Sequence, residues 1–304
     1  MPVSGILAET KLGWKMIFYS ISCIMMISTA LWIFFSANSP KDHRLTTESE
    51  REYIERGLNS TANRKLKTPW KEMFKSKGLW ATMSTHAGST VCYMLFFNEM
   101  PTYLEKALGI SLKNSAFLSA LPYLGMILGT IGSAGVCEKI YNKGYLSLST
   151  CRKLFNSIGF VGVSIGVITL AFCTPEQKSI AIVSLIATLT LNGFAAAGFI
   201  MSPLDMSPNY AGVMFAISNF VANIGSVLTP IVTSLILNND PTDLTRWRIV
   251  FFLAAGLCIT TSVAYVLFST ADRQEWDDPD YLDKRKSDPE EVKPSLSQEK
   301  AAAK

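Results

Sequence analysis

Seven stretches of the chain contain no charged side chain and consist mostly of apolar residues. They are residues 16–36, 79–98, 115–137, 154–173, 179–201, 211–238 and 249–269. Each has roughly the length of an α-helix that crosses a hydrocarbon core of about 30 Å. The apolar residues run together, as in Leu253-Ala254-Ala255, without the alternation typical of a membrane β-barrel. The pattern therefore predicts an all-α membrane protein with seven transmembrane helices.

The composition becomes informative only through the placement of its charges. A hydrophobic fraction of 49% and a mean hydropathy of +0.25 would fit a rather apolar soluble protein. All 28 Lys and Arg and all 24 Asp and Glu, however, lie outside the seven stretches. This segregation excludes a soluble globular enzyme. The net charge of +4 is explained by membrane orientation, so we expect the lipid bilayer as a partner and no nucleic acid.

The basic residues also predict which side of the membrane each connection faces. We assume that successive connections lie on opposite sides of the membrane. The connections and tail that follow the spans then contain 21 Lys and Arg on one side and 5 on the other. The richer side is expected to be cytosolic. The N-terminus is then outside or lumenal and the C-terminus is cytosolic. The 202–210 connection has no basic residue and does not contribute to this assignment.

Two connections differ in character from the rest. Residues 37–78 form the longest one, in which Thr47 to Glu50 is typical of a helix-capping box. In the same connection, Pro69 to Phe74 mixes aromatic and basic residues, as in an amphipathic helix at the headgroups; a solvated linker is the alternative. Residues 270–304 are rich in charge, and we expect a disordered cytosolic tail.

One polar stripe lies along the stretch 79–98. Thr82, His86, Ser89 and Tyr93 follow one another at helical spacing on an otherwise apolar helix. Polar groups at membrane depth usually face a cavity or a partner. Histidine has an unperturbed pKa near 6.5, so His86 is suited to a proton-coupled carrier. The alternative is a neutral histidine that serves packing only.

The stretch 211–238 carries a second stripe. Gly212, Ala216, Asn219 and Asn223 share a helix face, where the two amides either line a path or join neighbouring helices. Asn192 precedes a run of small residues in the stretch 179–201. Together, the candidate residues for a translocation path are His86, Ser89, Tyr93, Asn192, Asn219 and Asn223.

Glycines predict which helices pack closely. They recur along one face at Gly125, Gly129, Gly132 and Gly135, and along another at Gly159, Gly162 and Gly166. Small residues let helix backbones approach where no hydrophobic effect drives association. We therefore expect both stripes inside a helical bundle.

Motifs for catalysis are absent from the sequence. It contains no P-loop, no His and Cys cluster with metal-ligand spacing and no Gly-x-Ser-x-Gly elbow. We expect neither an enzyme nor a bound cofactor or metal. The six cysteines lie in or beside the predicted spans, so a disulfide framework is not expected either.

Several segments of the sequence form specific motifs. The most specific is Gly198-Phe199-Ile200-Met201-Ser202-Pro203-Leu204-Asp205-Met206-Ser207-Pro208-Asn209-Tyr210-Ala211-Gly212. Others are Met1 to Leu7 with Gly13-Trp14, Thr68-Pro69-Trp70, Leu121-Pro122-Tyr123-Leu124 and Glu275-Trp276. These segments resemble the anion transporter family of sialin, the vesicular glutamate transporters and the sodium/phosphate cotransporters. The resemblance covers about residues 1–280.

This family belongs to the major facilitator superfamily, in which two six-helix halves hold substrate between them. The resemblance implies a partial major facilitator fold with an incomplete N-terminal half. Residues 1–36 correspond to the end of helix five and to helix six, 37–78 to the linker between the halves, 79–269 to the C-terminal half and 270–304 to the tail. The resemblance also implies symport of organic or inorganic anions, driven by protons or sodium. The membrane would be the plasma membrane or that of a lysosome or vesicle.

The sequence also departs from this family. Pro203 stands where the family usually has histidine. Ser89 replaces the helix-seven arginine of the vesicular glutamate transporters, which argues against glutamate as the substrate. Glu138 matches an acidic residue after helix eight, but the arginine that usually follows it is not obvious. Sialin-like members carry a histidine that matches His86, which strengthens the interpretation that His86 is functional.

Two other functions remain open from the sequence. The chain alone is expected not to transport, so a non-transporting isoform that associates with a full-length carrier is the main alternative. A seven-helix receptor would share the span count and the outside N-terminus. The long cytosolic connection at 37–78 and the lack of paired outward cysteines argue against a receptor.

Overall fold

The computed structural model describes residues 7, 10–37, 39–57, 67–110, 118 and 120–281 of the chain. Each regular element within these residues is a helix, which confirms the all-α prediction. The long helices are α2 (Trp14–Phe35), α5 (Lys77–Met94), α8 (Leu121–Asn142), α9 (Leu148–Phe172), α10 (Lys178–Asn192), α12 (Ala211–Leu237) and α13 (Leu244–Phe268). The short ones are α3 (Glu48–Gly57), α4 (Trp70–Lys75), η1 (Leu95–Glu99), α6 (Met100–Thr102), η2 (Tyr103–Ala107), η3 (Gly193–Ala197), α11 (Ser202–Met206) and η4 (Glu275–Asp277).

Within the described residues, five helical segments are long and apolar enough to cross a membrane. They are Trp14–Phe35, Leu148–Phe172, Lys178–Met206, Ala211–Leu237 and Leu244–Phe268. The two other predicted spans, 79–98 and 115–137, correspond to α5 and α8. Helix α5 continues through η1, α6 and η2 as far as Ala107. Helix α8 begins at Leu121, with Pro122 in its first turn, where the missing N–H costs no helical hydrogen bond.

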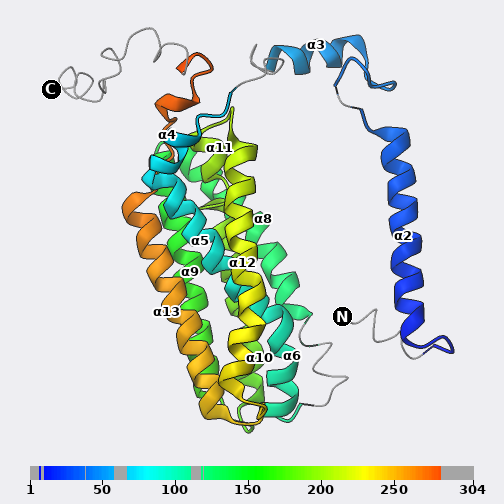
Figure 1. Ribbon diagram of the computed structural model, residues 1–304, viewed down its shortest axis with the longest axis vertical. Coiled ribbons are helices and arrows are strands. Elements are labelled where there is room, and N and C mark those ends of the chain that lie inside the picture. The colour runs from blue at the N-terminus through cyan, green and yellow to red at the C-terminus, as the bar shows by residue number, and fades with distance from the viewer. Residues whose placement is uncertain are drawn as a thin grey trace.

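Helices α5, α8, α9, α10, α12 and α13 form one bundle (Figure 1). Within it α9 packs on α13, α5 on α12 and α13, and α10 on α8 and α9. Helix α2 stands apart from the bundle in Figure 1, and none of its side chains is buried. The bundle therefore contains the residues of the predicted C-terminal half.

Glycines bring α10 close to its two neighbours. A methyl group on Gly129 of α8 would overlap the carbonyl oxygen of Thr190, and one on Gly162 of α9 would lie 2.6 Å from Leu191 Cδ1. Gly132 and Gly135 have open space beside them. The predicted packing stripe on α8 is therefore confirmed for its first half only, because the buried face of α8 continues through Ser133 and Cys137, and Gly132 and Gly135 lie off that face.

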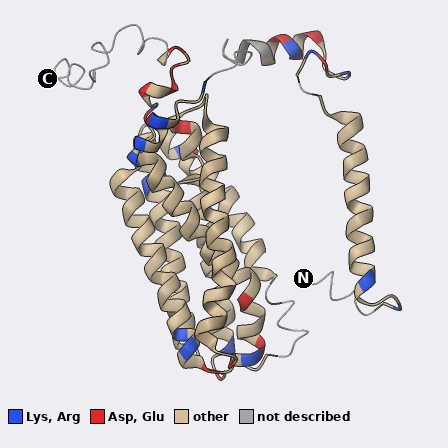
Figure 2. Ribbon diagram, in the orientation of Figure 1, with Lys and Arg blue, Asp and Glu red and all other residues tan. Residues whose placement is uncertain are grey.

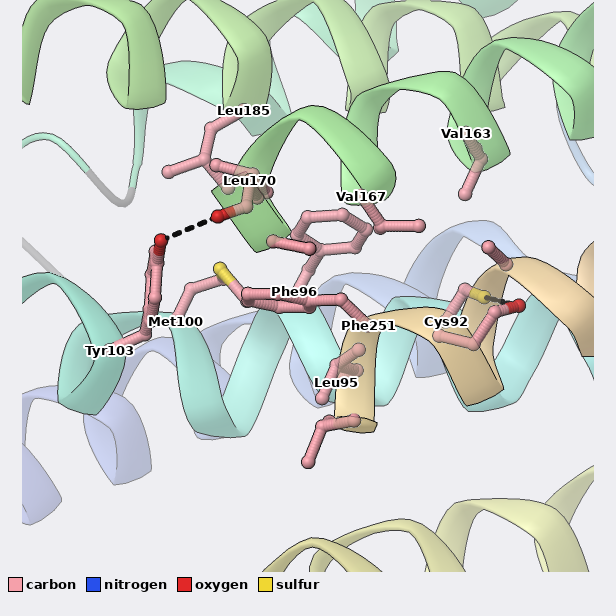
Figure 3. Close-up of a cluster of buried hydrophobic side chains, with 14 of the residues drawn as sticks. Cys92, Leu95, Phe96, Met100, Tyr103, Val163, Val167, Leu170, Leu185 and Phe251 are labelled. Atoms are coloured by element: carbon pink, nitrogen blue, oxygen red, sulfur yellow. Dashed lines mark hydrogen bonds between the residues drawn. The ribbon is translucent and has the colours of Figure 1, made fainter. Parts of the chain in front are cut away.

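The apolar core is densest where α5 and its extension cross α9 and α13 (Figure 3). Tyr103 is fully buried there, with its ring edge-on to Trp247 and Phe251, and its hydroxyl donates to the carbonyl oxygen of Leu170 at 2.8 Å. This bond satisfies the phenol inside an apolar cluster. It fixes the position of the α5 extension against α9.

Contacts between connections show at which end of the bundle each one lies. At one end, the Tyr210 hydroxyl donates to Lys67 O at 3.2 Å and Arg152 pairs with Asp205. At the other end, Lys178 Nζ donates to Gly109 O at 3.0 Å. The 202–210 connection, which has no basic residue, thus lies with 138–153 and the end of 37–78, as the alternation predicts. We call this the tail end of the bundle, because the chain beyond α13 also lies there (Figures 1 and 2).

The chain beyond α13 corrects one expectation. Residues 270–304 were expected to be disordered, but Trp276 and Asp277 are buried against the bundle and Glu275–Asp277 forms the helical turn η4. One large aromatic ring and one fully bonded carboxylate outweigh the charged sequence around them. The expectation is therefore wrong for residues 272–281, while 282–304 lie outside the described residues.

Candidate functional site: the polar face of the bundle

His86 lies at the junction of α5 and α12. Its Nδ1 is 2.9 Å from the hydroxyl of the buried Ser218, and its half-buried ring lies 5.4 Å from the ring of Phe199 and 5.6 Å from that of Phe215. The hydroxyl can donate to the neutral imidazole or accept from it, depending on the tautomer. The imidazole is thus held on one side and left partly open on the other. This is a geometry from which a proton or an anion can be bound.

The remainder of the α5 stripe divides into two groups. Thr82 is buried and donates to Gly78 O at 2.9 Å, within its own helix. Tyr93 is half-buried, with its ring 6.2 Å from that of Phe97 and edge-on to Tyr123 of α8 at 5.9 Å. Ser89 lies half-buried between these two regions. The stripe therefore presents His86, Ser89 and Tyr93 to the partly open face, while Thr82 serves its own helix.

Tyr123 adds a polar group that the sequence did not single out. Its hydroxyl is buried and has no hydrogen-bond partner within the described part of the chain. Such a group is costly unless water or a ligand satisfies it. The aromatic group of Tyr93, Phe97 and Tyr123 therefore carries a hydroxyl that is available to a bound molecule.

The two amides of α12 do not join the His86 group. Asn219 and Asn223 are both exposed, and Asn223 Nδ2 donates to Asn219 O at 2.8 Å and to Asn219 Oδ1 at 3.3 Å. They form a pair of their own on the surface of the bundle. Ser218, which the periodicity did not select, takes the position beside His86 instead.

Asn192 occupies a different place. It is the last residue of α10, half-buried, just before the chain tightens into η3 against α8. Gly193 permits this approach, because a methyl group there would lie 2.5 Å from Met126 O. Asn192 therefore belongs to the α8–α10 side, and the predicted residues do not form a single cluster.

The tail end contains an ion pair that the sequence does not predict. Arg152 of α9 binds Asp205 of α11 through two bonds, Nε to Oδ2 at 2.7 Å and Nη2 to Oδ1 at 3.2 Å. Arg152 Nη1 also donates to Ala197 O at 2.9 Å, and the two side chains are only 16% and 11% exposed. A bidentate pair of this kind is strong and directional. It ties α9 to the irregular segment between α10 and α12.

Beside this pair lies a cleft of about 410 Å³ between α8, α9 and η3. Its lining includes Cys137, Glu138 and Arg152. Glu138, the residue that matches the family's acidic position, thus lines the same cleft as Arg152. The two residues lie on helices that a short connection joins.

The segment after α13 forms a second polar centre at the tail end. Asp277 is fully buried and accepts hydrogen bonds from Ser207 Oγ at 2.6 Å, from Asn209 N at 3.0 Å and from Arg273 Nε at 2.6 Å. Burial and the carboxylates of Asp277 and Asp278 raise the pKa of Tyr210, whose ring packs beside Trp276. The carboxylate thereby fastens the chain after α13 to the connection before α12.

Comparison with known proteins agrees with this architecture. The Major Facilitator Superfamily model matches residues 1–230 and 144–299. The chain therefore belongs to the Major Facilitator Superfamily, and its all-helical bundle is part of that fold.

The chain is also similar to individual members of known families. It is 32% identical over 285 residues to "Putative inorganic phosphate cotransporter" of Drosophila melanogaster, 28% over 276 residues to human "Sialin" and 29% over 291 residues to human "Vesicular glutamate transporter 2". These matches cover 92%, 91% and 94% of this chain, and 54%, 55% and 49% of the three relatives. The predicted resemblance is thus confirmed, and the chain spans about half the length of the curated relatives it matches.

Proposed function

We propose that this chain provides the C-terminal half of a secondary carrier for small organic or inorganic anions. The observation that carries the proposal is the His86–Ser218 contact on the partly open face of the bundle. We propose that α5 crosses the membrane. A polar, titratable side chain at the middle of such a helix, bonded on one side and open on the other, is costly unless it serves a path or a partner. The names of the relatives supply the substrate class, and protons or sodium are the proposed coupling ions.

In this proposal His86, Ser89 and Tyr93 line the translocation path on α5. Asn219 and Asn223 line it on α12, and Asn192 on α10. The tail end of the bundle faces the cytosol, because the basic residues are concentrated in its connections. The membrane is the plasma membrane or that of a lysosome or vesicle.

The open face requires a second wall. In this superfamily substrate is held between two halves that rock against each other, and within the described residues the amides of Asn219 and Asn223 are exposed. We propose that a second set of helices covers them. A second candidate function follows from the same observation: the exposed amides also suit a non-transporting protein that associates with a full-length carrier.

The test is uptake by liposomes that contain the 304-residue chain. The chain is reconstituted alone, and also after co-expression with the part of the Drosophila melanogaster relative that lies outside its match to this chain. Phosphate, sialic acid and glutamate are offered under an imposed proton gradient and under a sodium gradient. We expect saturable uptake of phosphate or sialic acid by the combined protein and none by the chain alone. If the two parts co-purify but take up no anion, the transport proposal fails and the second candidate is favoured.

A further inference from the structure

Three large aromatic side chains are exposed where the chain enters the bundle at its tail end. Trp70 and Phe74 of α4 and Trp80 of α5 are 52%, 43% and 55% exposed. Their rings follow one another, with centroid distances of 6.3 Å from Trp70 to Phe74 and 6.4 Å from Phe74 to Trp80. They form a continuous apolar patch, and such patches mark interaction sites.

The orientation of this patch is fixed by the opposite face of α4. Met73 is fully buried in a cluster with Leu79, Met206 and Trp276, so α4 cannot turn its aromatic side inward. The indole Nε1 of Trp80 donates to Phe74 O at 2.8 Å, which joins the end of α4 to the first turn of α5. The exposure of the three rings is therefore built into the fold.

Positive charge surrounds the rings. Lys71, Lys75 and Lys77 are all exposed. None of the three takes part in an ion pair within the described part of the chain. Glu72, the acidic residue of α4, is half-buried. The surface thus combines three aromatic rings with three ammonium groups on α4 and the first turn of α5.

The depth of this surface follows from the span that it precedes. Trp80 lies in the first turn of α5 and α4 comes directly before it, so both lie at the level of the lipid headgroups when α5 crosses the membrane. At that level aromatic rings reach the upper acyl region while lysine ammonium groups meet phosphate and carboxylate. A leaflet with anionic lipid attracts such lysines, whereas a zwitterionic one does so far less.

We propose that Trp70, Phe74, Trp80, Lys71, Lys75 and Lys77 form a binding surface for anionic phospholipids at the tail end of the bundle. The rings insert beside the acyl chains and the lysines bind the headgroups. Because Met73 fastens α4 to α11 and to the segment around Trp276, a bound lipid also holds these elements at the membrane surface. The proposal does not depend on the transport function.

The test uses quenching of tryptophan fluorescence in the full 304-residue chain. The chain is placed in phosphatidylcholine nanodiscs that contain either brominated phosphatidylserine or the same fraction of brominated phosphatidylcholine. We expect stronger quenching by the brominated phosphatidylserine. In the triple variant Lys71→Gln, Lys75→Gln, Lys77→Gln the apparent preference should fall by about tenfold or more, since each lysine contributes independently to attraction by an anionic surface.

A matched control keeps the comparison specific. Lys139→Gln with Lys143→Gln removes two exposed lysines at the same end of the bundle, away from the aromatic patch, and should retain most of the preference. Replacing Trp70 and Trp80 by Phe should remove the difference in quenching between the two brominated lipids, while the exposed Trp14 and Trp32 of α2 are still quenched by both. Equal quenching of the unmodified chain by the two brominated lipids would overturn the proposal and favour a protein partner for the patch. A preference that survives the triple substitution would overturn it as well.

Discussion

Arg152 of α9 and Asp205 of α11 are 53 residues apart in the sequence, and their ion pair joins the two helices. The guanidinium engages both carboxylate oxygens and still donates to Ala197 O, so each of its nitrogens that faces the protein is used. The pair fixes α11 relative to α9 at the tail end.

We predict that Arg152→Ala destabilises the chain by about 3–5 kcal/mol, because it leaves the carboxylate of Asp205 buried without its partner. Thermal unfolding of the purified chain in detergent measures this loss. Arg152→Ala combined with Asp205→Ala should lose less stability than Arg152→Ala alone, since no uncompensated charge remains. Equal unfolding temperatures for the unmodified chain and Arg152→Ala would contradict the assigned role.

Asp277 should hold the chain after α13 in place. In Asp277→Ala the donors from Ser207, Asn209 and Arg273 lose their acceptor, at a cost of about 1–3 kcal/mol for each buried donor left unpaired. We expect faster cleavage by trypsin after Arg273. Glu275→Gln, which changes an exposed acidic residue in the same turn, serves as the control and should be cleaved like the unmodified chain. Equal cleavage rates in Asp277→Ala would show that the carboxylate does not fasten this segment.

Two glycines of α8 allow a direct test of helix packing. Gly129→Ala places a methyl group against the backbone of α10, whereas Gly132→Ala meets nothing within 4 Å. We predict a loss of about 1–3 kcal/mol for Gly129→Ala, the usual cost of overpacking, and little change for Gly132→Ala. Unfolding temperatures of the two variants check this. The same temperature for both would mean that α8 and α10 do not approach closely at Gly129.

The grouping of the connections predicts the sidedness of labelling. In a chain with Cys23→Ser, a cysteine at Tyr145 lies at the tail end and one at Glu176 lies at the other end; both positions are exposed. A membrane-impermeant maleimide applied to intact cells should label at most one of the two positions, and it should label both after the membrane is permeabilised. Labelling of both positions from one side would rule out the bundle topology.

Five of the seven charge-free stretches correspond to helical segments of the described residues that are long and apolar enough to cross a membrane, and the other two correspond to α5 and α8. The stretches are visible in the sequence because hydrocarbon tolerates few charges. Helical periodicity also predicts one face for His86, Ser89 and Tyr93, and each of these residues is half-buried in α5. It could not show which neighbour each residue meets. Ser218 is adjacent to Asn219 in sequence, yet only Ser218 reaches His86, because the rotation of α12 about its axis is set by packing against α5.

Charged residues near the ends of spans were harder to interpret. In the sequence, Arg152 cannot be distinguished from the other basic residues of the connections, and Asp205 reads as part of a solvated loop. Only the fold brings the two side chains together. The expected disorder after residue 270 failed for a related reason. Local composition there is highly charged, but the stability of residues 272–281 comes from long-range contacts of Trp276 and Asp277, which composition does not show.

The most direct test of the central claim is the pH dependence of anion uptake in liposomes with the combined protein described above, for His86→Ala and the control Ser84→Ala. Ser84 lies on the same helix and bonds within it, to Ala81 O at 2.9 Å. If the face around His86 forms the translocation path, His86→Ala lowers the uptake rate by about tenfold or more, the size of effect expected from losing a positioned acid or base, and changes its pH profile, whereas Ser84→Ala changes neither. Unchanged uptake and an unchanged pH profile in His86→Ala, at equal amounts of folded protein, would contradict the proposal and leave His86 as a packing residue.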